Sequence, residues 1–197
     1  ITRANLAACY PRSTTQERNQ LAKKSLQETF KTLFEVAIFW EWPIEQCMST
    51  INEVEGTELI DTALQGGQGV ILLAPHLGNW ELAGLFMSTK YAMAALFKPP
   101  KMKELEPYMT KVRQRAGSEL VPTNKRGVLR LFKILQKGGV VGILPDQDPT
   151  ATGGVYAPFF GIQTNSMKLV SKLIEKTKAT VLICSAARLG KGSGFKL

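Results

Sequence analysis

The residues best suited to chemistry stand together at His76-Leu77-Gly78-Asn79-Trp80-Glu81. His76 is the only histidine in the sequence, and it lies between a proline and a Gly-Asn pair that can shape a turn and cap a helix. A carboxylate bonded to one ring nitrogen of a histidine fixes the tautomer, leaves the other nitrogen free to take a proton and stabilises the imidazolium that results. We therefore expect His76 to act as a general base and Glu81 to orient it. The alternative is that a lone histidine beside such a turn is a structural or surface residue.

Spacing limits how His76 and Glu81 can meet. On one regular helix, five steps would leave their side chains about 140° apart. We therefore expect His76 in a loop and Glu81 in the first turn of a helix capped near Asn79, where the carboxylate can fold back toward the imidazole. The sequence contains no GxSxG elbow, and no Ser or Cys lies close to His76. The nucleophile is then a hydroxyl of the substrate, which attacks directly.

The hydrophobic pattern predicts the elements that position this segment. Short runs rich in branched apolar residues alternate with stretches of helical periodicity. The predicted strands cover residues 69–74, 92–97, 119–122, 140–144 and 179–184, and the predicted helices cover 57–64, 80–87, 101–115, 125–137 and 165–176. This order indicates one α/β domain over residues 1–197, with a largely parallel or mixed central sheet and helices on both faces. Asp146 and Gln147 follow the second apolar strand, so they reach the same sheet edge as His76.

An amphipathic helical segment precedes this domain. Thr14 and Glu17 have the spacing of a capping box, apolar residues recur at helical spacing as far as Ala37, and the aromatic-rich end of the helix closes at Pro43. This end could be a foot at a membrane interface, a wall for an acyl chain, or a helix end packed on the core.

Charge and composition narrow the partners. Lys and Arg number 25 against 16 Asp and Glu, which gives a formal net charge of +9 and favours nucleic acid, anionic lipid, a phosphorylated sugar or an acidic carrier protein. Three cysteines without CxxC spacing indicate neither a disulfide framework nor a zinc site, and we expect no metal and no cofactor. No apolar run is long enough to span a membrane. The chain begins at Ile1 and ends at Leu197, and we expect it to be a fragment that lacks an upstream anchor and a closing element.

Three motifs in register resemble a known family. The segment His76–Glu81, then Leu144-Pro145-Asp146-Gln147, then Ala157-Pro158-Phe159-Phe160-Gly161 is similar to the bacterial lipid A biosynthesis acyltransferases, the lauroyl and myristoyl transferases of the lysophospholipid-acyltransferase-like superfamily. The resemblance implies an enzyme at the cytoplasmic face of the inner membrane. It would take an acyl chain from acyl-carrier protein or coenzyme A and esterify a hydroxyl of a phosphorylated glycolipid, a lipid A precursor.

The resemblance also assigns roles to individual residues. The catalytic pair falls on His76 and Glu81. The residues expected to bind substrate are Asn79, Arg113, Arg115, Arg126, Asp146 and Gln147. Phe159 and Phe160 lie in a stretch that could form an acyl-chain wall or a lid, or simply a packed loop.

The sequence also leaves other functions open. Phosphatidylinositol mannoside acyltransferases carry similar motifs, and a lysophospholipid acceptor is a further alternative within the superfamily. A basic module that binds nucleic acid or an anionic membrane would use the charge without chemistry, although no nucleic-acid-binding motif is present and we expect no nucleic-acid partner. A serine hydrolase is disfavoured because the nucleophile elbow is missing.

Overall fold

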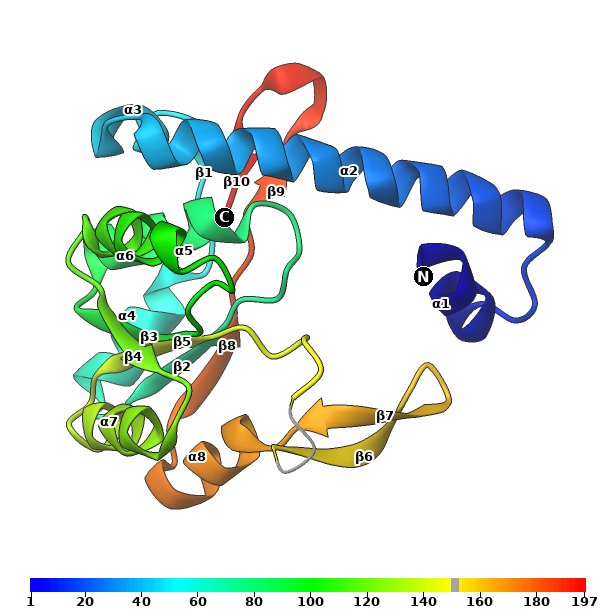
Figure 1. Ribbon diagram of the computed structural model, residues 1–197. Coiled ribbons are helices and arrows are strands. Elements are labelled where there is room, and N and C mark those ends of the chain that lie inside the picture. Colours follow the sequence, from blue (N-terminus) through cyan, green and yellow to red (C-terminus); the bar gives the residue numbers. More distant parts are fainter. Residues whose placement is uncertain (150–152) are drawn as a thin grey trace.

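A parallel sheet forms the centre of the protein. The computed structural model describes residues 1–149 and 153–197, and Figure 1 shows its sheet between two layers of helices. The five strands lie in the order β4-β3-β5-β2-β8, and every neighbouring pair is parallel. Their bounds are β2 (Val70–Leu73), β3 (Met93–Phe97), β4 (Glu119–Pro122), β5 (Val140–Ile143) and β8 (Thr180–Ile183). This confirms the α/β class and all of the predicted strands.

Helices precede, connect and cover these strands. They are α1 (Thr2–Cys9), α2 (Thr15–Glu41), α3 (Ile44–Met48), α4 (Thr57–Gln65), α5 (Trp80–Lys90), α6 (Glu106–Gln114), α7 (Lys125–Gln136) and α8 (Leu169–Thr177), with short 3₁₀ turns η1 (Lys103–Leu105) and η2 (Gly190–Gly192). A small sheet of β1 (Ile51–Glu53), β10 (Phe195–Lys196) and β9 (Ala187–Arg188) adjoins the main one. The remaining strands, β6 (Gly154–Phe159) and β7 (Ile162–Met167), form an antiparallel hairpin.

The sheet divides the core into two layers. Because side chains alternate along a strand, Val70 and Leu72 pack in one layer with residues of α4 and α5, whereas Ile71 packs in the other with residues of α7 and α8. Both layers are apolar, so both faces of the sheet must be covered. This requirement explains why the strands read as continuous branched runs in the sequence.

The long helix α2 begins and ends where its sequence predicts. The Thr14 hydroxyl accepts a hydrogen bond from the backbone N–H of Glu17, and the Glu17 carboxylate accepts one from the backbone N–H of Thr14. The helix stops at Glu41, shortly before Pro43. Its carboxyl-terminal half crosses above the sheet domain, and its amino-terminal half runs on beyond it beside α1 (Figure 1).

The β6–β7 hairpin replaces part of a predicted helix. The prediction of one helix over residues 165–176 is wrong at its start, because β7 continues through Met167 and α8 begins only at Leu169. Asn165 and Ser166 pair with β6, and such residues form helices weakly. The turn of the hairpin is Phe160-Gly161, and both residues have positive φ (52° and 78°). A phenylalanine in this conformation is strained, at a cost of about 1–3 kcal/mol.

The two-layer core predicts the effect of truncating a side chain in α7. Leu131 is fully buried, so Leu131→Ala should lower the free energy of unfolding by about 2–5 kcal/mol through lost burial and a cavity. Leu129 is on the same helix but 59% exposed, and Leu129→Ala should cost less than about 1 kcal/mol. Urea denaturation followed by circular dichroism measures both. Equal losses would contradict this description of the core.

Candidate active site

The register of two strands brings His76 and Asp146 together. Strands β2 and β5 are parallel neighbours, and Leu73 is level with Ile143. His76 and Asp146 each lie three residues beyond these positions, and both are preceded by a proline. Side chains that follow neighbouring parallel strands at equal distance meet at the carboxyl edge of the sheet, where sites of this fold class gather.

One carboxylate holds both the backbone and the ring of His76. Asp146 Oδ2 accepts the backbone N–H of His76 at 2.8 Å, and Asp146 Oδ1 lies 2.9 Å from His76 Nδ1. Partial burial by itself would raise the pKa of the Asp146 carboxyl, but the hydrogen bonds from the His76 ring and backbone lower that pKa overall. The ionised carboxylate can only accept, so Nδ1 carries the proton and Nε2 is left as the basic nitrogen.

The basic nitrogen of His76 faces a partner that a substrate can displace. The Gln147 side-chain amide nitrogen lies 3.2 Å from Nε2 and can donate to it. The Trp80 ring packs against the imidazole, with 4.7 Å between ring centres. The His76 side chain remains 28% exposed, so a ligand can reach it.

His76 lies in the wall of a large cavity of about 1290 Å³. Apolar side chains of α5 and β3, including Leu85, Met93 and Ala95, form one part of the lining. Trp40 at the end of α2 also lines it, which places the aromatic end of that helix at the site. A cavity of this size and character suits a ligand with a long apolar portion.

The structure differs from the sequence prediction at Glu81. The predicted positions are confirmed, because His76 lies in a loop and Glu81 in the first turn of α5. However, both Glu81 carboxylate oxygens accept from Arg113 Nε at 3.2 Å, and Arg113 Nη2 makes a further close contact with Glu81. The imidazole takes its hydrogen bond from Asp146 instead. Because the Glu81 side chain leaves α5 toward α6, it meets the guanidinium and not the ring.

Arg113 is therefore a member of the site, held by three contacts. Its guanidinium lies 5.6 Å from the ring centre of Phe97 and 5.9 Å from that of Trp40, in addition to its ion pair with Glu81. Its Nη1 has no hydrogen-bond partner among the described residues. A cation fixed in this way can stabilise negative charge on a ligand.

The other two predicted substrate arginines differ from each other, because Arg115 lines the cavity with Arg113 and His76 whereas Arg126 does not. Arg115 donates to the backbone carbonyls at the end of α2, at 3.1 Å from Trp40 O and 2.7 Å from Trp42 O, so its role is to cap that helix. Arg126 is exposed at the start of α7 and does not line the cavity. Arg115 therefore stays a predicted substrate-binding residue, whereas the side chain of Arg126 turns away from the cavity, which the sequence spacing does not determine.

Asn79 anchors the loop that carries His76. It is fully buried and caps α5, because its Oδ1 accepts the backbone N–H of Leu82 at 3.0 Å. Its Nδ2 donates to Glu35 of α2 at 3.0 Å. The prediction that Asn79 caps the helix is confirmed, whereas its role in substrate binding stays a prediction, and both polar atoms of its side chain already have partners within the protein.

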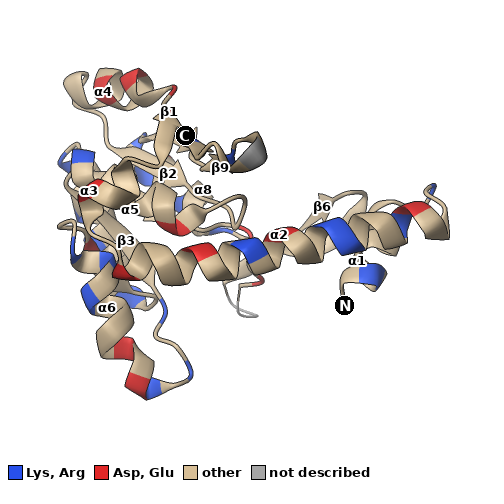
Figure 2. Cartoon of the chain, turned by 90° about the horizontal axis from the view of Figure 1, so that it is seen from above, with Lys and Arg blue, Asp and Glu red and all other residues tan. Residues whose placement is uncertain are grey.

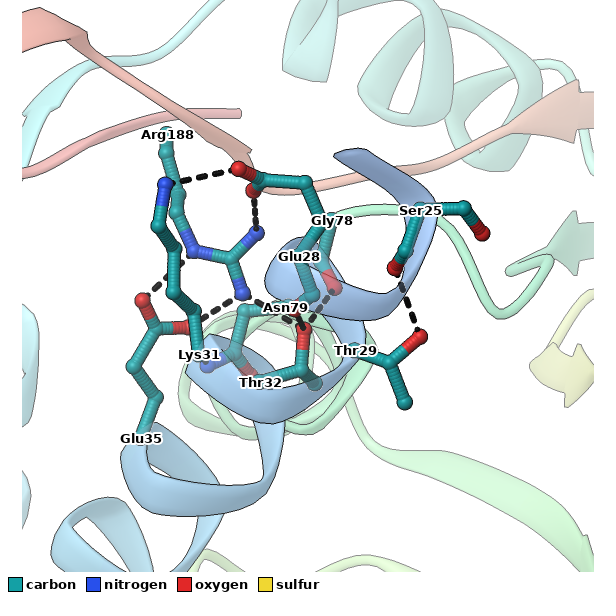
Figure 3. Close-up of polar contacts among 9 residues, drawn as sticks. All are labelled: Ser25, Glu28, Thr29, Lys31, Thr32, Glu35, Gly78, Asn79 and Arg188. Carbon is teal, nitrogen blue, oxygen red and sulfur yellow. Dashed lines mark hydrogen bonds and ion pairs between the residues drawn. The ribbon is translucent and has the colours of Figure 1, made fainter. Parts of the chain in front are cut away.

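A network around Arg188 ties the loop that carries His76 to α2 (Figure 3). Arg188 donates to both carboxylate oxygens of Glu35, at 2.5 Å and 2.6 Å, and to Glu28 at 2.9 Å. The pKa of Arg188 is raised, chiefly by its hydrogen bond with Glu35. Thr32 of α2 donates to the carbonyl of Gly78 at 3.3 Å. Nothing in the sequence marks Glu35 or Arg188 as part of a site, since 153 residues separate them.

The loop is also tied to the strand that carries Arg188. The backbone N–H of Asn79 donates to the carbonyl of Ala186 at 2.8 Å, and Gly78 forms a bridge with Ala186. Gly78 has a φ of 61°, and a Cβ there would lie 2.1 Å from the Ala186 oxygen. Only glycine fits this position, so the backbone between His76 and Glu81 is fixed from both sides.

Phe159 and Phe160 lie away from the cavity. They form the tip of the β6–β7 hairpin, where they are 60% and 51% exposed. Phe160 contacts Tyr10, with 5.5 Å between ring centres, so the hairpin reaches the segment between α1 and α2. The cavity lining includes Gly153 at the base of the hairpin but neither phenylalanine.

The described part of the chain lacks two features. None of its helices combines the length and the apolar character that a membrane span requires. Within residues 1–149 and 153–197, no cluster of three or more His, Cys, Asp or Glu side chains is placed to hold a metal ion.

Fold and site together define an α/β protein with a hydrogen-bonded histidine–carboxylate pair at the edge of a parallel sheet, in the wall of a partly apolar cavity. Comparison with known proteins is more specific. The model of the bacterial lipid A biosynthesis acyltransferase family matches residues 1–197, and the chain belongs to this family.

Individual relatives are more distant. The chain is 28% identical over 202 residues to a lipid A biosynthesis palmitoleoyltransferase of Escherichia coli, with all of this chain and 64% of the relative covered. A lauroyltransferase of the same organism is 23% identical over 198 residues, with the same coverage. A phosphatidylinositol mannoside acyltransferase of Mycobacterium tuberculosis is 29% identical over 149 residues, which is 73% of this chain and 46% of the relative. The chain thus spans somewhat less than two thirds of the length of these relatives.

The double role of Asn79 predicts a larger loss of stability than an ordinary helix cap would give. Asn79→Ala removes a buried cap together with the hydrogen bond to Glu35, so the free energy of unfolding should fall by about 2–3 kcal/mol. Asn124 caps α7 at the surface, where its Oδ1 accepts from the backbone N–H groups of Arg126 and Gly127. Asn124→Ala should cost about 1 kcal/mol. Thermal or urea unfolding compares the two variants, and a smaller loss at Asn79 would argue against this anchor.

Proposed function

We propose that this protein is an O-acyltransferase that moves a fatty acyl chain from a thioester donor to a hydroxyl of a phosphorylated glycolipid, a lipid A precursor. The observation that carries the proposal is the His76–Asp146 pair, whose free nitrogen lies in the wall of a cavity of about 1290 Å³ with an apolar part. Membership of the lipid A acyltransferase family and the names of the relatives support this reaction.

The reaction begins at His76 Nε2. The acceptor hydroxyl takes the place of the Gln147 amide and donates its hydrogen bond to Nε2. As its oxygen attacks the thioester carbonyl, the proton moves to the imidazole, and the Asp146 carboxylate stabilises the imidazolium. The tetrahedral intermediate then collapses, the carbon–sulfur bond breaks, and His76 returns the proton to the leaving thiolate.

The transfer is direct, without an acyl-enzyme. No serine or cysteine of the described residues is hydrogen-bonded to His76. The acceptor hydroxyl is therefore the nucleophile, and the histidine serves it as base. This supports the reading from the sequence that the nucleophile half of a triad comes from the substrate.

Hydrogen-bond donors must stabilise the negative charge on the oxygen of the tetrahedral intermediate. The backbone N–H of Asn79 is already bound to Ala186, which leaves the backbone N–H of Gly78 and Nη1 of Arg113 as candidates. Glu81 acts through Arg113, because its ion pair fixes the direction of the guanidinium. We assign Glu81 this positioning role, while Asp146 orients the imidazole.

Donor and acceptor follow from chemistry and relatives. An acyl chain fits the apolar part of the cavity beside Leu85 and Met93, and either acyl-carrier protein or acyl-coenzyme A can present it as a thioester. A phosphatidylinositol mannoside is the second candidate acceptor, since one relative that covers 73% of the chain is named for that substrate.

Variants of the three acidic and basic groups test the mechanism. His76→Ala should lower kcat about a thousandfold or more, and Asp146→Asn about a hundredfold or more, because the wrong tautomer is then favoured. Glu81→Gln should lose less than His76→Ala, since part of the geometry survives. The assay is transfer of a radiolabelled acyl chain from a thioester to a lipid A precursor in detergent micelles.

The control for these variants is Asp61→Asn. Asp61 lies on α4 and bonds Tyr91, remote from the site, so turnover should be unchanged. Wild-type turnover by the His76 variant would end the proposal of base catalysis. Salt-sensitive binding of DNA without any acyl transfer would favour the basic binding module instead.

A membrane surface is the proposed setting of the reaction. Leu26, Phe30, Leu33 and Phe34 follow helical spacing along α2, and each of them is between 49% and 72% exposed. Lys and Arg lie on α1 and along the amino-terminal half of α2 (Figure 2). An exposed apolar stripe with basic neighbours suits the interface of an anionic bilayer, where the acceptor lipid resides.

Removal of two aromatic rings tests this setting. Phe30→Ser with Phe34→Ser should weaken binding to vesicles that contain anionic lipid by at least about tenfold, because each ring contributes about 1.5–3 kcal/mol when fully buried. Val54→Ser with Leu59→Ser removes exposed apolar side chains elsewhere and should leave binding unchanged. Sedimentation with vesicles measures both, and equal binding by all variants would refute this surface.

A further inference from the structure

Four lysines line the same cavity as His76. Lys98 follows β3, Lys125 begins α7, and Lys168 and Lys172 lie at the start of α8. Lys168 and Lys172 are one helical turn apart and share a face. None of the four ammonium groups has a hydrogen bond or an ion pair with any described residue.

The acidic groups of the cavity do not balance these lysines. Two acidic side chains belong to its lining, Glu81 and Asp148. Glu81 is paired with Arg113, and Asp148 accepts from Asn165 Nδ2 at 2.9 Å. Asp146, nearby, is occupied by His76. The Asn165 amide is neutral, so Asp148 keeps its negative charge, but four lysines against this one carboxylate still give the lining a net positive potential that attracts an anion.

Lys125, Lys168 and Lys172 lie at helices on the other side of the sheet from Arg113, and Lys98 lies at the carboxyl end of β3. Helices α7 and α8 cover one face, where Leu131 and Leu173 pack together, whereas α5 covers the opposite face. Glu81 joins α5 to α6 through Arg113. The cavity therefore has basic groups from both sides of the sheet. Arg113 is paired with Glu81, whereas none of the four lysines has an ion pair among the described residues.

The chemistry of these lysines favours phosphate. Lysine ammonium groups are point charges on flexible stems, and several of them can surround a group that carries more than one negative charge and several acceptor oxygens. We propose that Lys98, Lys125, Lys168 and Lys172 form a subsite for a phosphate group of the substrate. The proposal rests on the proposed function, and the phosphate belongs either to the glycolipid acceptor or to the phosphopantetheine arm of the donor.

A pair of variants with a matched control tests the subsite. Lys125→Gln with Lys172→Gln removes one charge from α7 and one from α8. Lys133→Gln with Lys176→Gln removes the same charges from exposed positions of the same helices that do not line the cavity. Unfolding midpoints of both variants establish that each is folded.

Steady-state kinetics then compare substrates with and without phosphate. The acceptor is a lipid A precursor, intact or treated with phosphatase, and the donor is acyl-coenzyme A or the matching acyl-pantetheine. The Lys125/Lys172 variant should raise KM for one phosphate-bearing substrate at least about tenfold, with kcat within about twofold, because each lost contact involves a charged group. KM for the phosphate-free counterpart should not change, and the substrate that responds identifies the source of the phosphate.

Two results would overturn the subsite. One is unchanged KM for both phosphate-bearing substrates, as expected for the Lys133/Lys176 control. The other is a KM that rises only for acyl-carrier protein, which would assign the lysines to the acidic surface of the carrier.

Failure of the proposed function is distinguishable from failure of the subsite. If the wild-type protein transfers no acyl chain, binding of the phosphorylated precursor in micelles and of coenzyme A is measured directly by equilibrium methods. Weaker binding of either probe by the Lys125/Lys172 variant alone would sustain the phosphate subsite, and equal binding of both probes by all proteins would overturn it.

Discussion

The parallel pairing of β2 with β5 is the constraint on which the site depends. Leu73 and Ile143 are level, so the loops that follow them deliver His76 and Asp146 to the same place. A shift of one residue in this register would turn the alternating side chains of β2 to the wrong layer of the core. The burial of Val70, Ile71 and Leu72 therefore maintains the distance between the imidazole and its carboxylate.

A second constraint acts on the loop itself. Strand β2 ends before His76, so the register of the strands alone does not fix the position of the loop that carries His76. Without further contacts, this loop could move and separate the His76 ring from Asp146. Arg188, Glu35 and Asn79 prevent this by joining β9, α2 and the start of α5 in one network (Figure 3). Because α2 also carries the exposed apolar stripe, the element proposed to rest on the membrane is bonded directly to the loop that carries His76.

Local patterns predicted much of the fold, but they could not choose partners for side chains. Branched runs and helical periodicity located the five central strands, and the Gly-Asn pair located the cap of α5. Hydrophobic periodicity does not show which way a side chain points. The sequence therefore predicted Glu81 as the partner of His76, whereas in the structure the partner is Asp146. The contacts of Arg188 with α2 could not be predicted from the sequence, because only folding brings these distant residues together. The β6–β7 hairpin was missed, since Phe160-Gly161 lacks the usual signal of such a turn.

The arginines and the cavity lysines differ in how their charged groups are held. Arg113, Arg115 and Arg188 use their planar donors on carboxylates or on backbone carbonyls, and such contacts hold elements in one geometry. The four lysines of the cavity lining have no such partners among the described residues. A fixed arginine loses little conformational entropy when charge develops beside it, whereas a flexible lysine can adjust to a ligand as it binds and leaves. The proposed reaction, in which a lipid is bound, acylated and released to the membrane, would use both kinds of cation.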